Sequence, residues 1–386
     1  MSTTSTMSMI PGLMPPPPLS GPDLNACFAP DYAGARARFV EAAREAGAAL
    51  QACVLPLPGR QAETLALDVA RLGRTDAARW LVVSSGCHGV EGFCGSGIQV
   101  AALRAGALQA AAQAADVSVL MLHALNPHGF SHLRRVTQEN VDLNRNFADF
   151  ALPLPDNAGY RDLHALLLPE AWPPSGDNAQ ALTAYIAHHG LRAFQAAVSQ
   201  GQHSHPDGLF FGGHGPTWSR RTLEEVLPAQ MPQAQHIAWV DLHTGLGPSG
   251  VAERIYCGPP GKAGLDLARA WWGQGGAVPV TSTDDGSSVS APLTGLMAPA
   301  LARLWPQATF TGVALEYGTL PFEAVMQALR ADHWLHRHPE AAPGQRHEIA
   351  RQIRDAFYVD ADDWRAQVVA QALPVFHQAV QGLARA

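Results

Sequence analysis

The stretch Trp80-Leu-Val-Val-Ser-Ser-Gly-Cys-His-Gly-Val-Glu-Gly92 indicates both the fold class and one corner of a functional site. Its apolar run predicts a buried strand, and the glycines that follow predict a tight loop. His88 and Glu91 leave this loop three residues apart. Because glycine lets the backbone turn sharply, both side chains can be aimed at one point. We therefore expect His88 and Glu91 to be two ligands of one metal ion.

A second stretch repeats this design further along the chain. His236-Ile-Ala-Trp-Val-Asp-Leu-His-Thr-Gly245 is an apolar run that ends in a histidine and a glycine, which predicts a strand with His243 at its exit. Zinc in hydrolytic sites takes three protein ligands and keeps one position open for water. His243 is therefore the expected third ligand of a single zinc ion. Asp241 would face the same side of the strand, where it either orients a ligand histidine or bonds to a nearby loop amide.

Strand-like and helix-like segments alternate along most of the chain. Besides the two strands above, we expect strands at 52–57, 64–70, 117–124 and 309–317, and helices at 31–50, 95–115, 177–201, 219–227, 265–272, 321–336, 345–357 and 362–385. This alternation predicts an α/β fold with a mixed, largely parallel twisted sheet and helices on both faces. Ligands of such sheets bind beyond the carboxyl ends of the strands, where His88, His243 and Glu316 are expected to lie.

The length and composition of the chain limit the classes of protein to which it can belong. The chain has 386 residues, 47% of them hydrophobic, which is enough for one large core. A net charge of −7 argues against nucleic-acid and anionic-membrane partners, and no apolar run approaches the roughly 18 residues that span a bilayer. We expect residues 1–24 to be a disordered tail and residues 25–386 to form a single domain. Five cysteines without a paired spacing fit reduced thiols in a cytoplasmic protein.

The remaining chemistry has candidates elsewhere in the chain. Glu316 emerges from an apolar strand, where a buried carboxylate is costly, and we expect it to be the general base beside the metal. Asn144 and Arg145 lie in a polar loop, and the planar fork of an arginine either binds a substrate carboxylate through two hydrogen bonds or forms an internal ion pair. Arg134 and Arg135 are both candidates to stabilise the oxyanion, and strand-like alternation lets only one of them face the site.

Taken together, these residues resemble the zinc carboxypeptidases of the carboxypeptidase A type, over residues 50–335. The resemblance rests on His88-Gly-Val-Glu91, Asn126-Pro-His-Gly129, Val141-Asp-Leu-Asn-Arg-Asn-Phe147, His243 and Glu316. The motifs Asp241-Leu-His-Thr-Gly245 and Leu315-Glu-Tyr-Gly-Thr319 are most similar to those of a poorly characterised bacterial branch that is described as a domain of unknown function. The resemblance implies a zinc carboxypeptidase-like catalytic domain with the two-histidine, one-glutamate ligand set of carboxypeptidase A.

The resemblance also implies a substrate, a small peptide with a free carboxylate that Asn144 and Arg145 bind. Two features depart from the family. Ser290 to Leu296, where the family has its mobile tyrosine, contains none. Asp241-Leu-His243 is similar to the aspartoacylase and succinylglutamate desuccinylase relatives, which cleave acyl groups from amino acids. A metallocarboxypeptidase is therefore the first expectation, and an N-acyl-amino-acid deacylase is the alternative enzyme.

Two further classes of protein, a non-catalytic binding protein and a serine hydrolase, fit the sequence less well. A non-catalytic protein could bind zinc or a small acid, but structural zinc sites are usually closed by four cysteine or histidine ligands. Only three ligands can be named here, and Glu316 stands as a base beside them. A serine hydrolase is disfavoured because Cys94-Gly-Ser-Gly97 lacks the spacing of a nucleophile elbow. The sequence thus favours a zinc-dependent hydrolase.

Overall fold

The computed structural model describes residues 21–273, 278–288 and 290–386. Its strands are β1 (Ala49–Pro58), β2 (Thr64–Leu72), β3 (Arg79–Ser85), β4 (Ser118–His123), β5 (His236–Ser249), β6 (Ala252–Tyr256), β7 (Val280–Thr281) and β8 (Thr309–Gly318). They form one sheet in the order β1-β2-β4-β3-β5-β8-β6-β7. The central neighbours β4, β3, β5 and β8 run parallel, and antiparallel pairings flank them on both sides. The predicted mixed, largely parallel sheet is confirmed.

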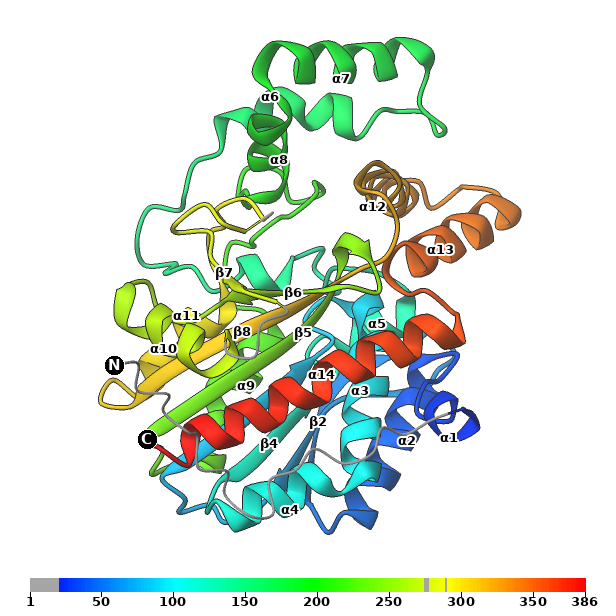
Figure 1. Cartoon of the computed structure of the whole chain (residues 1–386). Coiled ribbons are helices and arrows are strands. Elements are labelled where there is room, and N and C mark those ends of the chain that lie inside the picture. The colour runs from blue at the N-terminus through cyan, green and yellow to red at the C-terminus, as the bar shows by residue number, and fades with distance from the viewer. Residues whose placement is uncertain (1–20, 274–277, 289) are drawn as a thin grey trace.

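Helices cover both faces of this sheet (Figure 1). They are α1 (Pro22–Asn25), α2 (Tyr32–Glu45), α3 (Gly92–Ala105), α4 (Ala107–Ala114), α5 (Pro127–His132), α6 (Ala158–Leu167), α7 (Gly176–His189), α8 (Leu191–Ser199), α9 (Trp218–Gln230), α10 (Lys262–Trp272), α11 (Met297–Leu301), α12 (Phe322–Arg337), α13 (Pro343–Phe357) and α14 (Asp362–Leu383). Three short 3-10 helices complete the set, η1 (Gly89–Glu91), η2 (Leu143–Arg145) and η3 (Ala302–Leu304).

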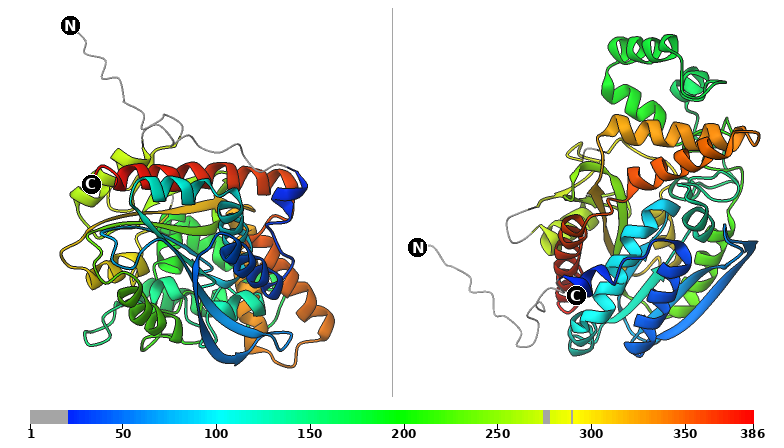
Figure 2. Two further views of the ribbon diagram at one scale, coloured as in Figure 1. Left: turned by 90° about the horizontal axis from the view of Figure 1, so that it is seen from below. Right: turned by 90° about the vertical axis from the view of Figure 1, so that its right-hand side faces the viewer.

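Alternate residues of the central strands face two hydrophobic layers. Leu81 and Val83 of β3 belong to a layer that includes residues of α2, α3 and α14. Trp80 and Val82 belong to a layer that includes residues of α9 and α11. Successive side chains of a strand point to opposite faces, so a strand covered on both faces is apolar throughout. Figure 2 shows the sheet between these helical layers from two further sides.

Two helices that the sequence predicts as continuous are each interrupted by a glycine. The segment 95–115 belongs to α3 and α4, which are separated at Gly106 with φ 69°. The segment 177–201 belongs to α7 and α8, which are separated at Gly190 with φ 86°. A positive φ is readily adopted by glycine and ends an α-helix. The prediction of unbroken helices was therefore wrong, because the apolar pattern continues across both glycines.

Strand β5 continues past Gly245 to Ser249, whereas β8 ends at Gly318, one residue after its predicted end. Their parallel ladder pairs His243 with Glu316, and β6 pairs with the same part of β8, placing Glu253 opposite Glu316. His243 and Glu316 therefore lie within strands rather than after them, whereas His88 follows β3 as expected. The difference arises because strand ends depend on neighbouring strands. The shared ladder also fixes the spacing between His243 and Glu316.

The tail expected at residues 1–24 lies mainly outside the described residues. Its last residues belong to the folded part of the chain, since Pro22–Asn25 form α1 and Leu24 is buried. The folded part therefore begins slightly earlier than the sequence predicts. None of the helices in the described ranges combines the length and the hydrophobicity that crossing a bilayer requires.

Helices α6, α7 and α8 project beyond the sheet, next to α12 (Figures 1 and 2). Leu163 of α6 and Phe194 of α8 share a hydrophobic cluster with residues of α12. Arg330 of α12 also donates hydrogen bonds to the Leu167 carbonyl and to Asn178 Oδ1, both at 2.8 Å. The α6–α8 segment is therefore joined to α12 by apolar packing and by hydrogen bonds.

Candidate metal and substrate site

His88, Glu91 and His243 bring three potential ligand atoms together. The Nδ1 of His88 lies 2.9 Å from Oε1 of Glu91, and the Nδ1 of His243 lies 3.1 Å from Oε2 of the same carboxylate. Ligand atoms of the three side chains lie within 4.8 Å of one another, and all three residues are buried. The structure thus brings together the three residues that the sequence predicts as metal ligands.

The loop that carries His88 and Glu91 is positioned by close packing of its backbone against residues 129–135. A Cβ atom on Gly89 would lie 2.0 Å from the carbonyl carbon of Gly129 and 2.4 Å from the carbonyl oxygen of Arg134, so no other residue fits without a shift. The Gly89 N–H donates to the carbonyl of Arg135 at 3.0 Å. The loop that carries His88 and Glu91 is therefore hydrogen-bonded to the loop that carries Arg134 and Arg135. Glycine at position 89 allows the two backbones to lie this close together.

The donor atoms suit a zinc ion. Nδ1 of His88 is buried and has no hydrogen-bond partner among the described residues, although Glu91 is near it. A buried polar atom without a partner is costly, and such atoms are usually satisfied by an ion, a water or another group. Two imidazole nitrogens and one carboxylate oxygen form a ligand set that zinc takes in hydrolytic sites. The residues present therefore fit a zinc ion held by His88, Glu91 and His243.

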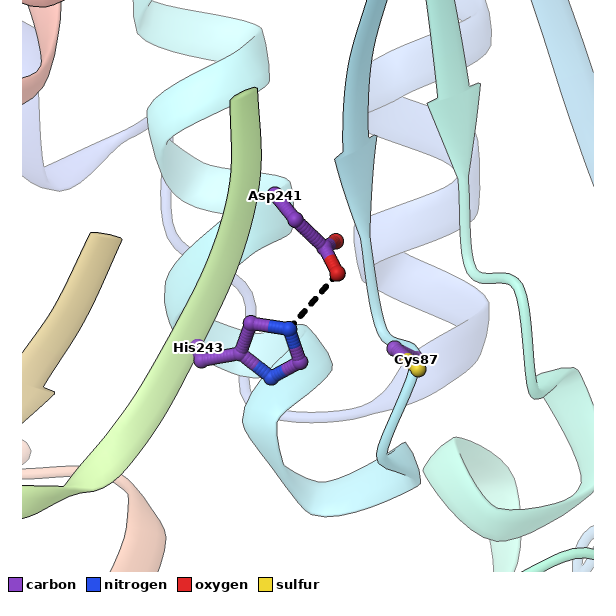
Figure 3. A group of neighbouring side chains, drawn as sticks. All are labelled: Cys87, Asp241 and His243. Carbon is purple, nitrogen blue, oxygen red and sulfur yellow. Dashed lines mark hydrogen bonds and ion pairs between the residues drawn. The ribbon is translucent and has the colours of Figure 1, made fainter. Parts of the chain in front are cut away.

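A carboxylate contacts the other ring nitrogen of each histidine. Asp241 Oδ2 lies 2.6 Å from His243 Nε2 (Figure 3), and Asp142 Oδ1 lies 3.1 Å from His88 Nε2. For His243, such a partner fixes the tautomer that leaves Nδ1 as an acceptor for a metal ion, whereas Nε2 of His88 also lies 2.9 Å from Nη2 of Arg135. The hydroxyl of Ser84 in turn donates to Asp241 Oδ1 at 2.6 Å. Of the two roles left open for Asp241, these contacts fit the orientation of a ligand histidine.

The charges around the three candidate ligands favour a cation. Burial lowers the pKa of His243, but Asp241 and Glu91 outweigh it and hold that pKa well above its usual value. Burial likewise opposes ionisation of Glu91, yet the charge of His88, together with His243 and Arg135, keeps the pKa of Glu91 below its usual range. A buried position that stabilises positive charge so strongly suits a divalent metal ion.

A second group of candidate ligands, Cys87, Asp241 and His243, shares His243 with the first (Figure 3). In this group the Nε2 of His243 is already in contact with Asp241. Burial, followed by the nearby carboxylates, raises the pKa of the Cys87 thiol well above its usual value. A raised pKa disfavours the thiolate, which is the form that binds metals. The group of His88, Glu91 and His243 is therefore the better candidate.

Glu316 lies on the strand next to His243 and in register with it. Its Oε1 accepts a hydrogen bond from the backbone N–H of Leu246 at 3.2 Å. Burial, and then the negative charge of Glu91, raise the pKa of Glu316 to about 8. A carboxyl group with a pKa near neutrality can accept a proton and return it, which is what a general base must do.

The two adjacent arginines point in different directions. Nη1 of Arg135 donates to Glu91 Oε1 at 2.8 Å, and its Nε donates to Asp142 Oδ2 at 3.1 Å, so this guanidinium borders the candidate metal ligands. Nε of Arg134 instead donates to Asp332 Oδ2 at 3.1 Å. Arg135 lines the pocket described below and Arg134 does not. Both arginines lie in a loop after α5, and the strand-like alternation predicted there is wrong.

Asn144 and Arg145 present hydrogen-bond donors to the same pocket. Arg145 donates from Nε and Nη2 to the Ser199 carbonyl, at 2.9 and 2.7 Å, and from Nη1 to the Asn144 carbonyl at 2.9 Å. Among the described residues, these three bonds leave two of the five N–H groups of its guanidinium for a ligand. Oδ1 of Asn144 accepts from the Met297 N–H at 2.9 Å, which leaves the side-chain NH2 to donate. Donors of this kind suit a carboxylate.

One pocket of about 150 Å³, whose walls are largely apolar, is bordered by His88, His243, Glu316, Arg135, Asn144 and Arg145. Part of the lining comes from α12, the end of α13 and Phe210, and another part comes from β6, β8 and the segment 290–296. Helix α8 contributes Gln195, Val198 and Ser199. Among the described residues that line the pocket, Glu316 is the one carboxylate.

Sequence reasoning missed Asp142 and the apolar walls. Asp142 stands two residues before Asn144 in the Val141–Phe147 motif, and that position was the available signal. The walls on α12 carried no signal, because apolar residues at helical spacing are also what a helix buries in a core.

Comparisons with known proteins agree with the fold. A sequence profile described as "Protein of unknown function (DUF2817)" matches residues 28–371, whereas none of the curated proteins compared matches the chain. The structure of bovine thrombin-activatable fibrinolysis inhibitor in complex with tick carboxypeptidase inhibitor is 8% identical, with a TM-score of 0.51 over 93% of this chain and 98% of that chain. Carboxypeptidase A from Helicoverpa armigera is 13% identical, with a TM-score of 0.42 over 84% and 73%.

A Shewanella frigidimarina protein provisionally named succinylglutamate desuccinylase/aspartoacylase is 15% identical, with a TM-score of 0.34 over 75% of this chain and 72% of that chain. At such identities a likeness concerns the fold alone, and of these three structures only the first has a TM-score above 0.5. The carboxypeptidase-like fold and the branch of unknown function that the sequence predicts are confirmed.

Proposed function

The chain belongs to the family described as "Protein of unknown function (DUF2817)", and from its site we propose that it is a zinc-dependent hydrolase that cleaves an amide bond next to a free carboxylate, as a metallocarboxypeptidase does. The observation that carries this proposal is the convergence of His88, Glu91 and His243 beside Glu316, in a pocket that Arg145 also lines. Three metal ligands with a carboxylate base beside them are the parts of a hydrolytic metal site, whereas a closed structural site has a fourth ligand.

Bound by the two histidines and Glu91, zinc would supply a Lewis acid and a water of lowered pKa. Glu316 accepts the proton of the attacking water and returns it to the leaving nitrogen. Arg135 stabilises the negative charge that develops on the carbonyl oxygen. Its guanidinium is already held by Glu91 and Asp142, so it needs little reorganisation during the reaction.

Asn144 and Arg145 bind the free carboxylate of the substrate. The Arg145 side chain is 4% exposed and lies 4.0 Å from Asp142, so a substrate without a carboxylate would leave its two remaining buried N–H groups without an acceptor. Sites built to hydrogen-bond a group reject analogues that lack it by about 10⁴–10⁵-fold. The enzyme should therefore strongly prefer substrates with a free carboxylate over their amides.

A second enzymatic candidate is an N-acyl-amino-acid deacylase, which makes the same demand for a carboxylate. The size of the pocket, about 150 Å³, favours it over an enzyme for long peptides. A protein that binds zinc or a small acid without catalysis is the candidate of another class. We also propose that residues 25–386 act as one catalytic domain, and that the protein is cytoplasmic, which its five free cysteines support.

The experiment compares zinc-loaded and chelator-treated protein on small N-acyl amino acids and dipeptides and on their C-terminal amides. Zinc-dependent turnover that is confined to the free acids is expected. Arg145→Lys should lower kcat/KM for the acids by about 10²-fold, because a lysine cannot form the planar fork, whereas Arg192→Lys on the exposed side of α8 should not. Equal turnover of acids and amides would contradict the role of Arg145, and turnover that chelation does not affect would contradict the zinc mechanism.

A further inference from the structure

We propose that the acyl side of the scissile bond carries one uncharged, apolar group, so that the substrates are N-acylated amino acids rather than free dipeptides or longer peptides. The inference rests on the proposed function and names the substrate class of the same site. It follows from the position of one apolar wall, from the charges next to that wall and from the size of the pocket.

The acyl wall is the apolar surface made by five pocket residues, Phe322, Val325, Met326, Leu329 and Phe357. It belongs to the same hydrophobic cluster as Val90, which stands between the candidate ligands His88 and Glu91. Phe357 of this wall also lies 5.9 Å from the guanidinium of Arg135, which donates to the candidate ligand Glu91. The acyl wall thus lies beside the metal ligands, where it can receive the acyl group of a substrate whose carboxylate binds at Asn144 and Arg145.

The charges beside the acyl wall are positive. The guanidinium of Arg135 lies 5.2 Å from the ring centre of Phe210 and 5.9 Å from that of Phe357, so it borders this wall. A divalent cation at the three candidate ligands would add to this charge. Glu316, the one carboxylate among the described lining residues, is already required as the base.

A free dipeptide would carry an ammonium group on the carbon next to its scissile carbonyl. That group would lie beside Arg135 and the metal ligands, without an acidic partner of its own among the described residues that line the pocket. Burying a charge beside like charges is unfavourable. A neutral acyl group avoids this repulsion and can contact the acyl wall, which favours an N-acylated amino acid.

The size of the pocket limits the length of the acyl group. A cavity of about 150 Å³ is known to bind benzene, and the pocket here is of about that volume. Helix α8 adds Gln195 and Val198 to the lining, and its last residue, Ser199, accepts two hydrogen bonds from Arg145. The hydrogen bonds of Arg330 join the same α6–α8 segment to α12. The pocket therefore has room for a short acyl group beside the acyl wall, whereas a longer peptide has to extend out of it.

The test uses two substrates that differ by one amino group, leucyl-leucine and 4-methylpentanoyl-leucine. The second should show at least a tenfold higher kcat/KM with the zinc-loaded enzyme. In a series of N-acyl-leucines that starts at acetyl, each added methylene should raise kcat/KM by about fourfold until the pocket is full, after which longer chains should lose activity. Equal or faster hydrolysis of leucyl-leucine would overturn the substrate class and leave the proposed function intact.

A variant of the acyl wall tests the role of charge. Met326→Glu adds a carboxylate to the wall and should reduce the preference for 4-methylpentanoyl-leucine at least tenfold. Ala324→Glu adds the same charge at an exposed position of the same helix and should leave the preference unchanged. An unchanged preference in a folded Met326→Glu protein would overturn the inference.

Calorimetric measurement of substrate binding to the zinc-loaded Glu316→Gln protein tests the substrate class without turnover. This test remains available if Met326→Glu does not fold. Binding of 4-methylpentanoyl-leucine that is at least tenfold tighter than that of leucyl-leucine supports the inference, and equal or weaker binding overturns it. Absence of hydrolysis for every substrate would contradict the proposed function alone, because this binding comparison does not depend on catalysis.

Discussion

Glu316→Gln separates catalysis from stability, and both effects can be derived from the position of this carboxyl group. The substitution keeps the shape of the side chain but removes the group that accepts a proton from water. Zinc content should stay unchanged, because Glu316 is not one of the three candidate ligands. Turnover should fall by about 10²–10⁴-fold, the usual contribution of a general base.

The same substitution should stabilise the metal-free protein at neutral and alkaline pH. Burial and Glu91 raise the pKa of Glu316 from 4.5 to about 8. A raised folded-state pKa contributes stability that is fully present below pH 4.5 and is lost as the pH rises through 8. The glutamine stays neutral throughout. Because one pKa unit corresponds to about 1.4 kcal/mol, the advantage of the variant in unfolding free energy should be about 3 kcal/mol larger at pH 8 than at pH 5.

The assay is urea unfolding of metal-free wild type and variant at pH 5 and pH 8, with Glu323→Gln as an exposed control on α12. Added zinc should reduce the pH dependence, because a nearby cation favours the ionised carboxylate. If the stability difference is the same at both pH values, Glu316 does not have the raised pKa on which the argument depends. If turnover stays within a few-fold of wild type, it is not the base.

Three further substitutions test the surrounding residues. Arg135→Gln should lower kcat by about 10²–10³-fold in steady-state assays, because it removes a donor to the oxyanion, and an unchanged kcat would contradict that role. Arg134→Gln should leave kcat within a few-fold but lower the urea-derived unfolding free energy by about 3–5 kcal/mol, since it removes the guanidinium that pairs with the buried carboxylate of Asp332. The opposite pattern would reverse the assignment of the two arginines. Asp241→Asn should weaken zinc binding by about 10–100-fold in chelator competition, whereas wild-type affinity would show that Asp241 does not orient His243.

The fold and the site could be predicted best where the pattern of apolar and polar residues within one strand reports which side chains are buried. The apolar runs of β3 and β5 predict strands covered on both faces because every side chain of such a strand is buried. The two-residue spacing of Asp241 and His243 predicts that they share a face, because the strand period is two. The parts of the site that follow from strand and loop geometry were therefore predictable.

Features that depend on distant residues were not predictable from sequence. Arg134 turns away from the pocket because its partner, Asp332, lies 198 positions further along the chain. The continuation of β5 to Ser249 depends on pairing with β8, and the contact of Asp142 with His88 spans 54 positions. Such partners are set by the tertiary fold, and no periodicity within one segment reports them.

The central claim is that His88, Glu91 and His243 hold one zinc ion, and zinc content tests it most directly. The measurement is elemental analysis of the purified wild type, of His88→Ala and of His347→Ala, the last being an exposed histidine on α13. The wild type and His347→Ala should each bind about one equivalent of zinc, and His88→Ala should lose most of it, because the site would keep only two of its three protein ligands. A wild type that binds no zinc, or a His88→Ala protein that retains all of it, would contradict the account.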